Sequence, residues 1–238
     1  MTGSVSRRSK AVVLLSGGLD SSTVFASAGE RRFELYALSF RYAQRYIEEL
    51  ARAEAVARTQ RAAKHIAAQI DLRDFGGSAL TGDIAVPKGR TASNMLHSIP
   101  VSYVPSRNTV FLSFAPARAE TLGAPDIFTG VNALDYSGYP DCRPKYLAAY
   151  ETMANLATKT GVEGARKLKI HAPLISLTTA QIIQEGLRLG VDHAQSSSCY
   201  EPGKLGKPCG ACDSCLLRAK GFREASLNDP LDLRFDMA

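Results

Sequence analysis

A serine-flanked pair of glycines near the start of the chain has the residue types that bind phosphate groups. In LLSGGLDSS, residues 14–22, Gly17 and Gly18 let backbone amides point into one concavity, and the neighbouring serine hydroxyls supply further donors. An apolar run precedes this turn and Thr23-Val24-Phe25 follows it, so we expect a strand before it and a helix after it. Because the N-terminus of a helix attracts anions, the stretch predicts a phosphate site.

The pattern of this turn differs from the commoner phosphate loops. It does not fit the P-loop pattern G-x-x-x-x-G-K-[ST], since no lysine follows the glycines, and it does not fit G-x-G-x-x-G. The pattern S-G-G-x-D-S instead resembles the pyrophosphate loop of the ATP pyrophosphatase family. Members of that family cleave ATP between its α and β phosphates to activate an oxygen as an adenylate. A plain Gly-Gly turn with Asp20 as the helix N-cap is the alternative interpretation.

That resemblance implies which residues contact the nucleotide. The ATP phosphates are expected on Ser16, Gly17, Gly18, Asp20, Ser21 and Ser22. Asp20 is the candidate catalytic residue, because its carboxylate suits a Mg2+ ion on the phosphates as well as the start of a helix. Leu15 and Phe25 are expected to flank the pocket, although Phe25 fits the hydrophobic core equally well. ATP with Mg2+ is therefore the expected co-substrate.

Four cysteines near the C-terminal end have the spacing of a metal site. The pattern C-x9-C-x2-C-x2-C is formed by Cys199, Cys209, Cys212 and Cys215. Four thiolates suit tetrahedral zinc, and a site with four protein ligands is closed and therefore structural. An iron–sulfur cluster is the alternative, but the fourth cysteine and the Cys-Pro ending of the ferredoxin run are replaced by Leu216-Leu217-Arg218. The sequence favours structural Zn2+, and the isolated Cys142 is interpreted as a packing residue.

These motifs together resemble the 7-cyano-7-deazaguanine synthase family, whose members form a nitrile on the pathway to queuosine and archaeosine. The similarity extends over most of the chain, through LLSGGLDSS, SFRYAQR, YVPSRNTVFLS, GVNALDYSGYPDCRP and SSSCYEPGKLGKPCGACDSCLLRAKGF. Three positions depart from the family pattern. Ala43 and Tyr46 stand where the family usually has glycine and histidine in Y-G-Q-R-H, and Ser197 stands where a tryptophan is frequent.

The resemblance implies a ligase reaction. It predicts that 7-carboxy-7-deazaguanine and ammonia become the nitrile with consumption of two ATP, through an adenylated acid, an amide and an adenylated amide. AMP is a far better leaving group than hydroxide, so the protein needs only to position the partners and stabilise charge on the phosphates. The sequence names no general base. A homologue that stops at the amide, or that acts on another carboxylate, is an alternative.

The loop NALDYSGYPDCRP supplies the candidate substrate residues. A guanine-like edge presents two adjacent N–H donors, which the carboxylate of Asp135 or Asp141 is able to accept, and Tyr136 is able to stack on the ring. Arg107 or Arg143 is expected to bind the substrate carboxylate in bidentate fashion. Ordinary turn formation is the alternative for this loop, and an ordinary surface arginine is the alternative for each arginine.

The elements that must position these residues alternate between strands and helices. We expect strands at 11–15, 34–40, 65–71, 126–131 and 168–171. Helices are expected at 20–28 before Gly29, 42–64, 106–121 with a kink at Pro116, 146–159, and from a capping box at Thr178–Gln181 to Gly190. Residues 73–100 are predicted to form a long loop, and His171 is interpreted as a packed core histidine.

This order indicates an α/β fold with a doubly wound parallel sheet, which the resemblance identifies as the PP-loop ATP pyrophosphatase, adenine nucleotide alpha hydrolase-like architecture. A nucleotide-binding domain is expected over residues 1–190 and a four-cysteine, loop-rich zinc subdomain over residues 191–238. Such a short tail would depend on its metal for folding.

The composition points to a soluble globular protein. The chain has 238 residues, of which 45% are hydrophobic and 22% are charged, and no apolar span approaches the ~20 residues of a membrane helix. The apolar run 11–15 behind Arg7-Arg8-Ser9-Lys10 is too short for a signal peptide, so a cytoplasmic location is expected. The net charge of +6 suits anionic small molecules, and the basic residues are scattered.

Two other functions stay open from the sequence. A tRNA-thiolating enzyme pairs the same ATP loop with cysteines that carry sulfur or an iron–sulfur cluster, but needs a basic tRNA-binding module that the sequence does not show. A non-catalytic nucleotide sensor with a zinc-stabilised dimer interface would bind ATP without releasing AMP and pyrophosphate. The resemblance implies a homodimer that uses ATP, the substrate acid and ammonia, with no membrane partner and no direct contact with nucleic acid.

Overall fold

A computed structural model describes residues 8–42, 48–91, 99–134, 139–164 and 166–232 of the chain. The strands are β1 (Lys10–Leu14), β2 (Glu34–Arg41), β3 (Lys64–Gln69), β4 (Asp126–Phe128) and β5 (Lys169–His171). The α-helices are α1 (Leu19–Glu30), α2 (Glu48–Thr59), α4 (Arg107–Leu122), α5 (Pro144–Ala157), α6 (Lys159–Glu163), α7 (Thr179–Arg188) and α8 (Asp213–Glu224). Short 3-10 helices are η1 (Arg73–Phe75), η2 (Pro140–Cys142), η3 (His193–Gln195) and η4 (Lys204–Gly206). Among the described residues no helix has the length and apolar character that a membrane crossing requires.

The five strands form one parallel sheet in the order β3-β2-β1-β4-β5. β1 is central, since Val13 is in register with Ala37 of β2 on one side and with Phe128 of β4 on the other. The strand order reverses between β1 and β4, and sheets of this kind bind ligands there, beyond the carboxyl ends of the strands. The predicted doubly wound α/β fold is confirmed.

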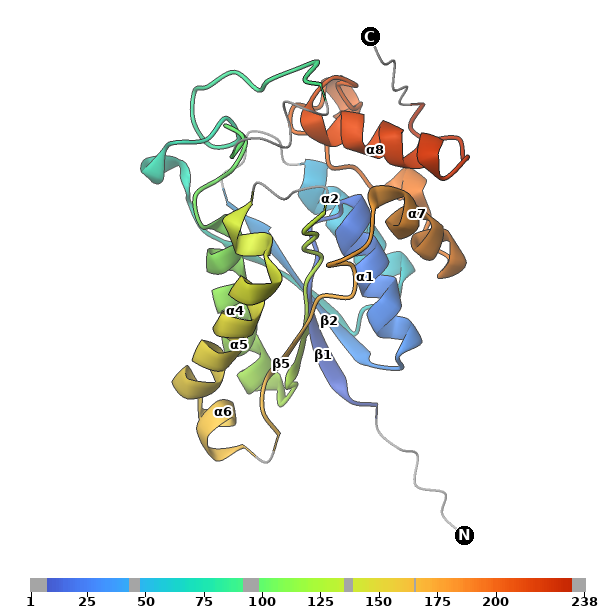
Figure 1. The fold of residues 1–238 in the computed structure, drawn as a ribbon. Coiled ribbons are helices and arrows are strands. Elements are labelled where there is room, and N and C mark those ends of the chain that lie inside the picture. Colours follow the sequence, from blue (N-terminus) through green and yellow to red (C-terminus); the bar gives the residue numbers. More distant parts are fainter. Residues whose placement is uncertain (1–7, 43–47, 92–98, 135–138, 165, 233–238) are drawn as a thin grey trace.

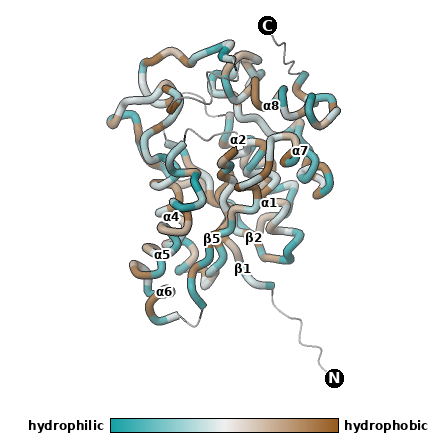
Figure 2. The backbone as a smooth tube through the Cα atoms, in the orientation of Figure 1, coloured by the Kyte–Doolittle hydropathy of each residue, from teal (hydrophilic) through white to brown (hydrophobic). Residues whose placement is uncertain are grey.

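Alternate side chains of the central strand enter two hydrophobic layers. Val12 packs in a cluster with Leu112 of α4 and Leu147 of α5, whereas Val13 packs with residues of α1, α2 and α7 such as Phe25. Figure 1 shows α4, α5 and α6 on one side of the sheet and α1 and α7 on the other. In Figure 2 the hydrophobic colour gathers on the strands and the adjoining helix surfaces. Helices therefore cover both faces of the sheet.

Several element boundaries differ from those expected. α1 continues through Gly29 to Glu30, and the chain then reverses at Arg32, whose φ is 63°. The long helix expected to reach residue 64 ends at Thr59, because the chain turns at Arg61 with a φ of 58° and enters β3. The strand expected over 126–131 ends at Phe128. A Cβ on Gly130 would lie 3.1 Å from the Ser21 nitrogen, so the chain crosses the start of α1 there.

The helices after β3 agree better with the sequence. α4 runs through Pro116 and ends at Gly123, which has the left-handed conformation expected at such an end. The capping box of α7 is present, with the Thr178 side chain accepting from the Gln181 N–H and the Gln181 side chain accepting from the Thr178 N–H. No helix was expected after Gly190, yet α8 spans twelve residues and packs across α7 (Figure 1). The expectation of a loop-rich tail is therefore wrong for residues 213–224.

Candidate active site

The serine–glycine turn lies between β1 and α1, as predicted, and its polar groups bond within the turn. The Ser16 N–H donates to Ser21 Oγ at 3.2 Å, and Ser22 Oγ donates to the Gly18 carbonyl at 2.8 Å. The N-cap of α1 is Gly18, which makes no side-chain cap bond, so Asp20 belongs to the first turn of the helix. The alternative in which Asp20 is the N-cap is wrong.

The two glycines of the turn have close neighbours in different parts of the chain. Gly17 has a φ of 81°, and a Cβ there would lie 2.6 Å from the Ala53 nitrogen and 2.7 Å from the Glu49 carbonyl oxygen, both in α2. A Cβ on Gly18 would lie 2.6 Å from Ser198 Oγ. The turn is therefore held between α2 and the C-terminal region, and Gly17, which meets backbone at a positive φ, has no room for a side chain.

A cavity of about 210 Å³ opens beside the turn, at the carboxyl ends of the strands. Leu15, Ser16, Gly18, Asp20 and Ser21 line it, whereas Phe25 is fully buried in the core with α7, so that its core interpretation holds. Ser22 is also fully buried and supports the turn from inside. The charged side chains that line the cavity come from four separate elements: Asp20, Glu49, Arg107 and Asp141.

The predicted substrate residues fall into three groups. Arg107 and Asp141 line the cavity. Arg143 is the N-cap residue of α5 and is exposed, outside the cavity lining. Asp135 and Tyr136 lie outside the described residues, as do the two family departures Ala43 and Tyr46. The structure thus brings Arg107 and Asp141 to the phosphate turn and leaves Arg143 away from it.

Asp141 holds the start of α4 in place. Its carboxylate accepts the Asn108 backbone N–H at 2.9 Å and the Asn108 Nδ2–H at 3.2 Å, and Asn108 Nδ2 also donates to Cys142 Sγ at 3.2 Å. Arg107, the first residue of α4, lies with its guanidinium 5.8 Å from the Tyr42 ring centre and 5.9 Å from that of Phe111. Because Arg107 directly precedes Asn108, the bonds from Asn108 to Asp141 also help to position Arg107.

Burial changes the acidity of several groups in the cavity wall. Burial raises the pKa of Glu49 to about 7, although Arg107 acts in the opposite direction. Burial, followed by the charge of Asp141, raises the pKa of the Cys142 thiol to about 12, so the thiol is protonated at neutral pH. Burial and the nearby Glu49 raise the pKa of Tyr42 to about 12. Burial thus brings the pKa of the Glu49 carboxyl group close to neutral pH.

The four clustered cysteines fit a tetrahedral metal. Their Sγ atoms all lie within 4.8 Å of one another, and sulfurs about 2.3 Å from one zinc ion would be ~3.8 Å apart. Backbone N–H groups point at the sulfurs: Cys209 donates to Cys199 Sγ at 3.2 Å and Cys212 donates to Cys209 Sγ at 3.3 Å. All five cysteines are free of disulfides, so the cluster is not held together covalently. This donor set suits Zn2+.

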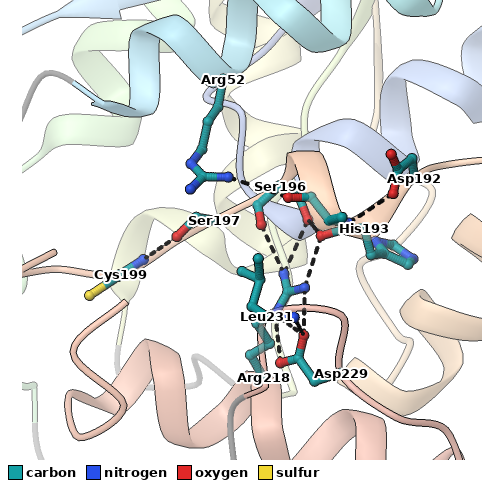
Figure 3. Close-up of polar contacts among 10 residues, drawn as sticks. Arg52, Asp192, His193, Ser196, Ser197, Cys199, Arg218, Asp229 and Leu231 are labelled. Atoms are coloured by element: carbon teal, nitrogen blue, oxygen red, sulfur yellow. Dashed lines mark hydrogen bonds and ion pairs between the residues drawn. The ribbon is translucent and has the colours of Figure 1, made fainter. Parts of the chain in front are cut away.

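Residues 196–200, which we call the connecting segment, link the cysteine cluster to the phosphate turn. The Ser197 N–H donates to the Gly17 carbonyl at 3.1 Å, and Cys199 is two residues further on. Behind the segment, Arg218 of α8 donates to the Ser196 carbonyl at 3.2 Å and to the Ser196 hydroxyl at 3.1 Å (Figure 3). Asp229 accepts from Arg218 Nε and Nη2 at 2.9 Å each.

Sequence reasoning missed several residues of this site. Glu49, Asn108 and Arg218 were not predicted as site residues, although Asn108 and Arg218 lie within stretches that resemble the family. Each contributes through contacts between separate elements of the fold. Tyr139 was missed as well: it lines the cavity, and it lies in the loop that supplied the candidate substrate residues.

His171 was interpreted from the sequence as a packed histidine. Its ring stacks on Phe128 with ring centres 4.4 Å apart and bonds Asp126 at 2.8 Å, in keeping with that interpretation.

The fold, the glycine turn at the switch point and the adjoining four-cysteine cluster define an α/β protein of the PP-loop, adenine-nucleotide-binding class. The chain belongs to the family of the queuosine biosynthesis protein QueC, whose model matches residues 10–226. A 7-cyano-7-deazaguanine synthase from Desulfatibacillum aliphaticivorans is 61% identical over 224 residues, 94% of this chain and 96% of its own. The synthase from Kineococcus radiotolerans is 59% identical, over 94% and 97% of the two chains.

Proposed function

We propose that the protein is an ATP-dependent ligase that converts 7-carboxy-7-deazaguanine and ammonia to 7-cyano-7-deazaguanine. Relatives that carry the synthase name are about 60% identical over almost their whole length. The observation that carries the proposal is the cavity, in which the phosphate turn with Asp20 meets Arg107 and Asp141 in one space. This arrangement supports the proposal, because a nucleotide and an anionic substrate bound in one cavity would lie within reach of each other.

The chemistry needs two activations of one oxygen-bearing carbon. The substrate carboxylate attacks the α-phosphorus of ATP, pyrophosphate leaves, and the acyl adenylate that forms reacts with ammonia to give the amide and AMP. The amide oxygen then attacks the α-phosphorus of a second ATP and pyrophosphate leaves, and loss of AMP and of two protons from nitrogen gives the nitrile. The protein supplies amide N–H groups, the helix N-terminus and hydroxyls to stabilise charge on the phosphates.

Each residue has a role in this proposal. Ser16, Gly17, Gly18, Ser21 and Ser22 form the phosphate site, and Asp20 is the residue placed to hold Mg2+. Arg107 binds the substrate carboxylate, because its guanidinium is fixed between aromatic rings at the cavity wall. Asp141 or Asp135 accepts from the edge of the deazaguanine ring, with Tyr136 stacked on it. Arg143 is the weaker candidate for the carboxylate because it lies outside the cavity.

The four cysteines hold a structural zinc ion in this proposal, as the sulfur geometry and the N–H···S bonds suit it. The region 191–238 then acts as a metal-stabilised subdomain attached to a nucleotide-binding domain formed by residues 1–190. We further propose that the protein acts in the cytoplasm as a homodimer, with small-molecule partners alone. Metal analysis of the purified protein tests the first point, with one zinc per chain expected and iron with a brown colour contradicting it.

The decisive experiment measures products directly. The protein is incubated with ATP, Mg2+, ammonium and 7-carboxy-7-deazaguanine, and amide, nitrile, AMP and pyrophosphate are quantified by mass spectrometry and chromatography. Asp20→Ala is expected to abolish turnover with the fold intact, while Asp74→Ala, which removes an exposed carboxylate of η1, leaves it unchanged. ADP and inorganic phosphate as products, ATP binding without AMP release, or full activity of Asp20→Ala would each contradict the proposal.

A further inference from the structure

The cavity wall contains a carboxylate that the roles above leave unassigned. Glu49 lies in the first turn of α2 and lines the same cavity as Asp20 and Arg107. We propose that Glu49 is the general base of the reaction, which removes protons from the nitrogen as the amide and then the nitrile form. The inference rests on the proposed ligase function, and it supplies the proton acceptor that this chemistry requires.

Packing fixes Glu49 beside the phosphate turn. The Glu49 carbonyl oxygen lies 2.7 Å from where a Cβ on Gly17 would be, so the first turn of α2 touches the backbone that is to hold the phosphates. Further along the same helix, Arg52 donates to the carbonyls of Gln195 and Gly206 at 3.4 and 3.3 Å, which fixes α2 against the C-terminal region. These contacts hold the backbone of α2 that carries Glu49 in a fixed position beside the phosphate turn.

The other carboxylates of the cavity are committed to other contacts. Both oxygens of Asp141 accept from Asn108, and Asp20 stands in the first turn of α1 where the phosphates are expected. Glu49 is thus the carboxylate of the described cavity lining that is placed to exchange a proton with substrate nitrogen.

The groups that face Glu49 leave it able to act at neutral pH. Arg107 of α4 and Tyr42 at the end of β2 interact with it electrostatically, and Tyr139 and Tyr200 stand around the same guanidinium. Burial raises the pKa of Glu49 to about 7, while Arg107 opposes the rise. A base whose pKa matches the working pH combines a large ionised fraction with a useful affinity for the proton.

Each step balances with Glu49 as the acceptor. Ammonia attacks the acyl adenylate, the C–N bond forms, the C–O bond to AMP breaks with its electron pair, and Glu49 takes one proton from nitrogen to leave the amide. After the second adenylation the nitrogen carries two hydrogens and a positive charge. Glu49 takes one of these protons to give the neutral imidate and passes it to water. Glu49 takes the other as AMP departs, and the N–H electron pair becomes the third C–N bond. Glu49 returns each proton to water.

The test separates proton removal from nucleotide activation. Glu49→Gln and Glu49→Asp are compared with Glu54→Gln, which changes an exposed carboxylate on the same helix. Exchange of labelled pyrophosphate into ATP, with the substrate acid present and ammonia absent, needs no base and is expected to stay within about twofold of wild type in Glu49→Gln. Amide and nitrile formation from ammonium is expected to fall by about 10²-fold or more, the usual contribution of a general base.

Hydroxylamine provides a second control. It is a weak base and a strong nucleophile whose adduct loses its proton readily to water, so Glu49→Gln is expected to trap the acyl adenylate as a hydroxamate at close to the wild-type rate. The pH–rate profile for amide formation is expected to lose its limb near pH 7 in Glu49→Gln and to keep a shifted limb in Glu49→Asp.

Two results overturn the inference. Wild-type amide and nitrile rates in Glu49→Gln would show that no base is needed at this position. An equal loss of pyrophosphate exchange and of amide formation would show that Glu49 acts in nucleotide binding. Absence of acid-dependent pyrophosphate exchange in the wild-type protein would instead refute the ligase function itself, so the two failures are distinguishable.

Discussion

Replacement of Arg218 by methionine tests how the C-terminal region is held to the phosphate turn. Arg218 has 5% of its side chain exposed and Asp229 has 1%, so the pair is removed from water. Its guanidinium also donates to the carbonyls of His193 and Ser196, at 2.9 and 3.2 Å. Methionine fills much of the volume but leaves the Asp229 charge and two carbonyl groups without these donors.

The expected cost follows from that burial. Removing one partner of a buried ion pair destabilises a protein by about 3–5 kcal/mol, because the remaining charge is uncompensated. For a chain of this size about 1 kcal/mol corresponds to a change in melting temperature of about 2–4 °C. Arg218→Met is therefore expected to lower the melting temperature by roughly 6–20 °C.

Arg188 offers a matched control with similar bonds on the surface. Its guanidinium contacts Glu30 at 2.6 Å and Glu185 at 2.8 Å, but 53% of its side chain is exposed. Arg188→Met is expected to lower the melting temperature far less than Arg218→Met, since water screens exposed pairs. Both variants are measured by thermal unfolding and by urea titration at equal metal content, together with the KM for ATP.

The double variant Arg218→Met/Asp229→Leu separates the ion pair from packing. Removing both charges together is expected to recover part of the lost stability, because no buried charge is then left uncompensated, while the His193 and Ser196 carbonyls still lack their donor. The reasoning is refuted if Arg218→Met costs no more than Arg188→Met, or if the double variant is less stable than the single one. A KM for ATP that rises in Arg218→Met would follow from the contact between the connecting segment and Gly17.

Two further results are expected. Gly17→Ala should abolish ATP binding and lower the free energy of unfolding, measured in urea, far more than Gly76→Ala. Both glycines have a positive φ, which costs a residue with a side chain about 1–2 kcal/mol. Only at Gly17 would the new Cβ also meet a backbone atom, at 2.6 Å. Burial lowers the pKa of His193 below its usual value, so the folded protein holds this imidazole in its neutral form. The contribution of His193 to the free energy of unfolding is therefore complete above about pH 6.5 and is lost as the pH falls below that value. His193→Gln should accordingly show a smaller loss of urea resistance between about pH 7.5 and about pH 5.5.

Local signals in the sequence were enough for the sheet and the phosphate turn. The run AVVLL reads as a strand buried on both faces, and Val12 and Val13 do enter different layers. The turn was predicted because its glycines and serines are contiguous, and the cysteine cluster because its spacing brings four sulfurs together. Each of these features depends on residues close together in the chain.

The parts that were missed depend on contacts between distant segments. α8 buries Asp213, Ser214 and Arg218 beside Cys215 and Phe222, so its inner face is half polar and shows no apolar stripe at helical spacing. Glu49 belongs to the site only because α2 packs against Gly17, which the sequence does not show. The end of α2 at Thr59 was missed for a similar reason, since the turn at Arg61 is set by entry into β3.

The cysteine cluster bears on the reaction through the backbone. Cys199 lies within the connecting segment, Ser198 of that segment lies against Gly18, and the Ser197 N–H bonds the Gly17 carbonyl. Ser198 and Tyr200, on either side of Cys199, both line the cavity. Whatever holds the four sulfurs together therefore also fixes one wall of the cavity and one side of the phosphate turn. A metal ion bound by these four cysteines would therefore support the phosphate turn through the backbone without contacting substrate.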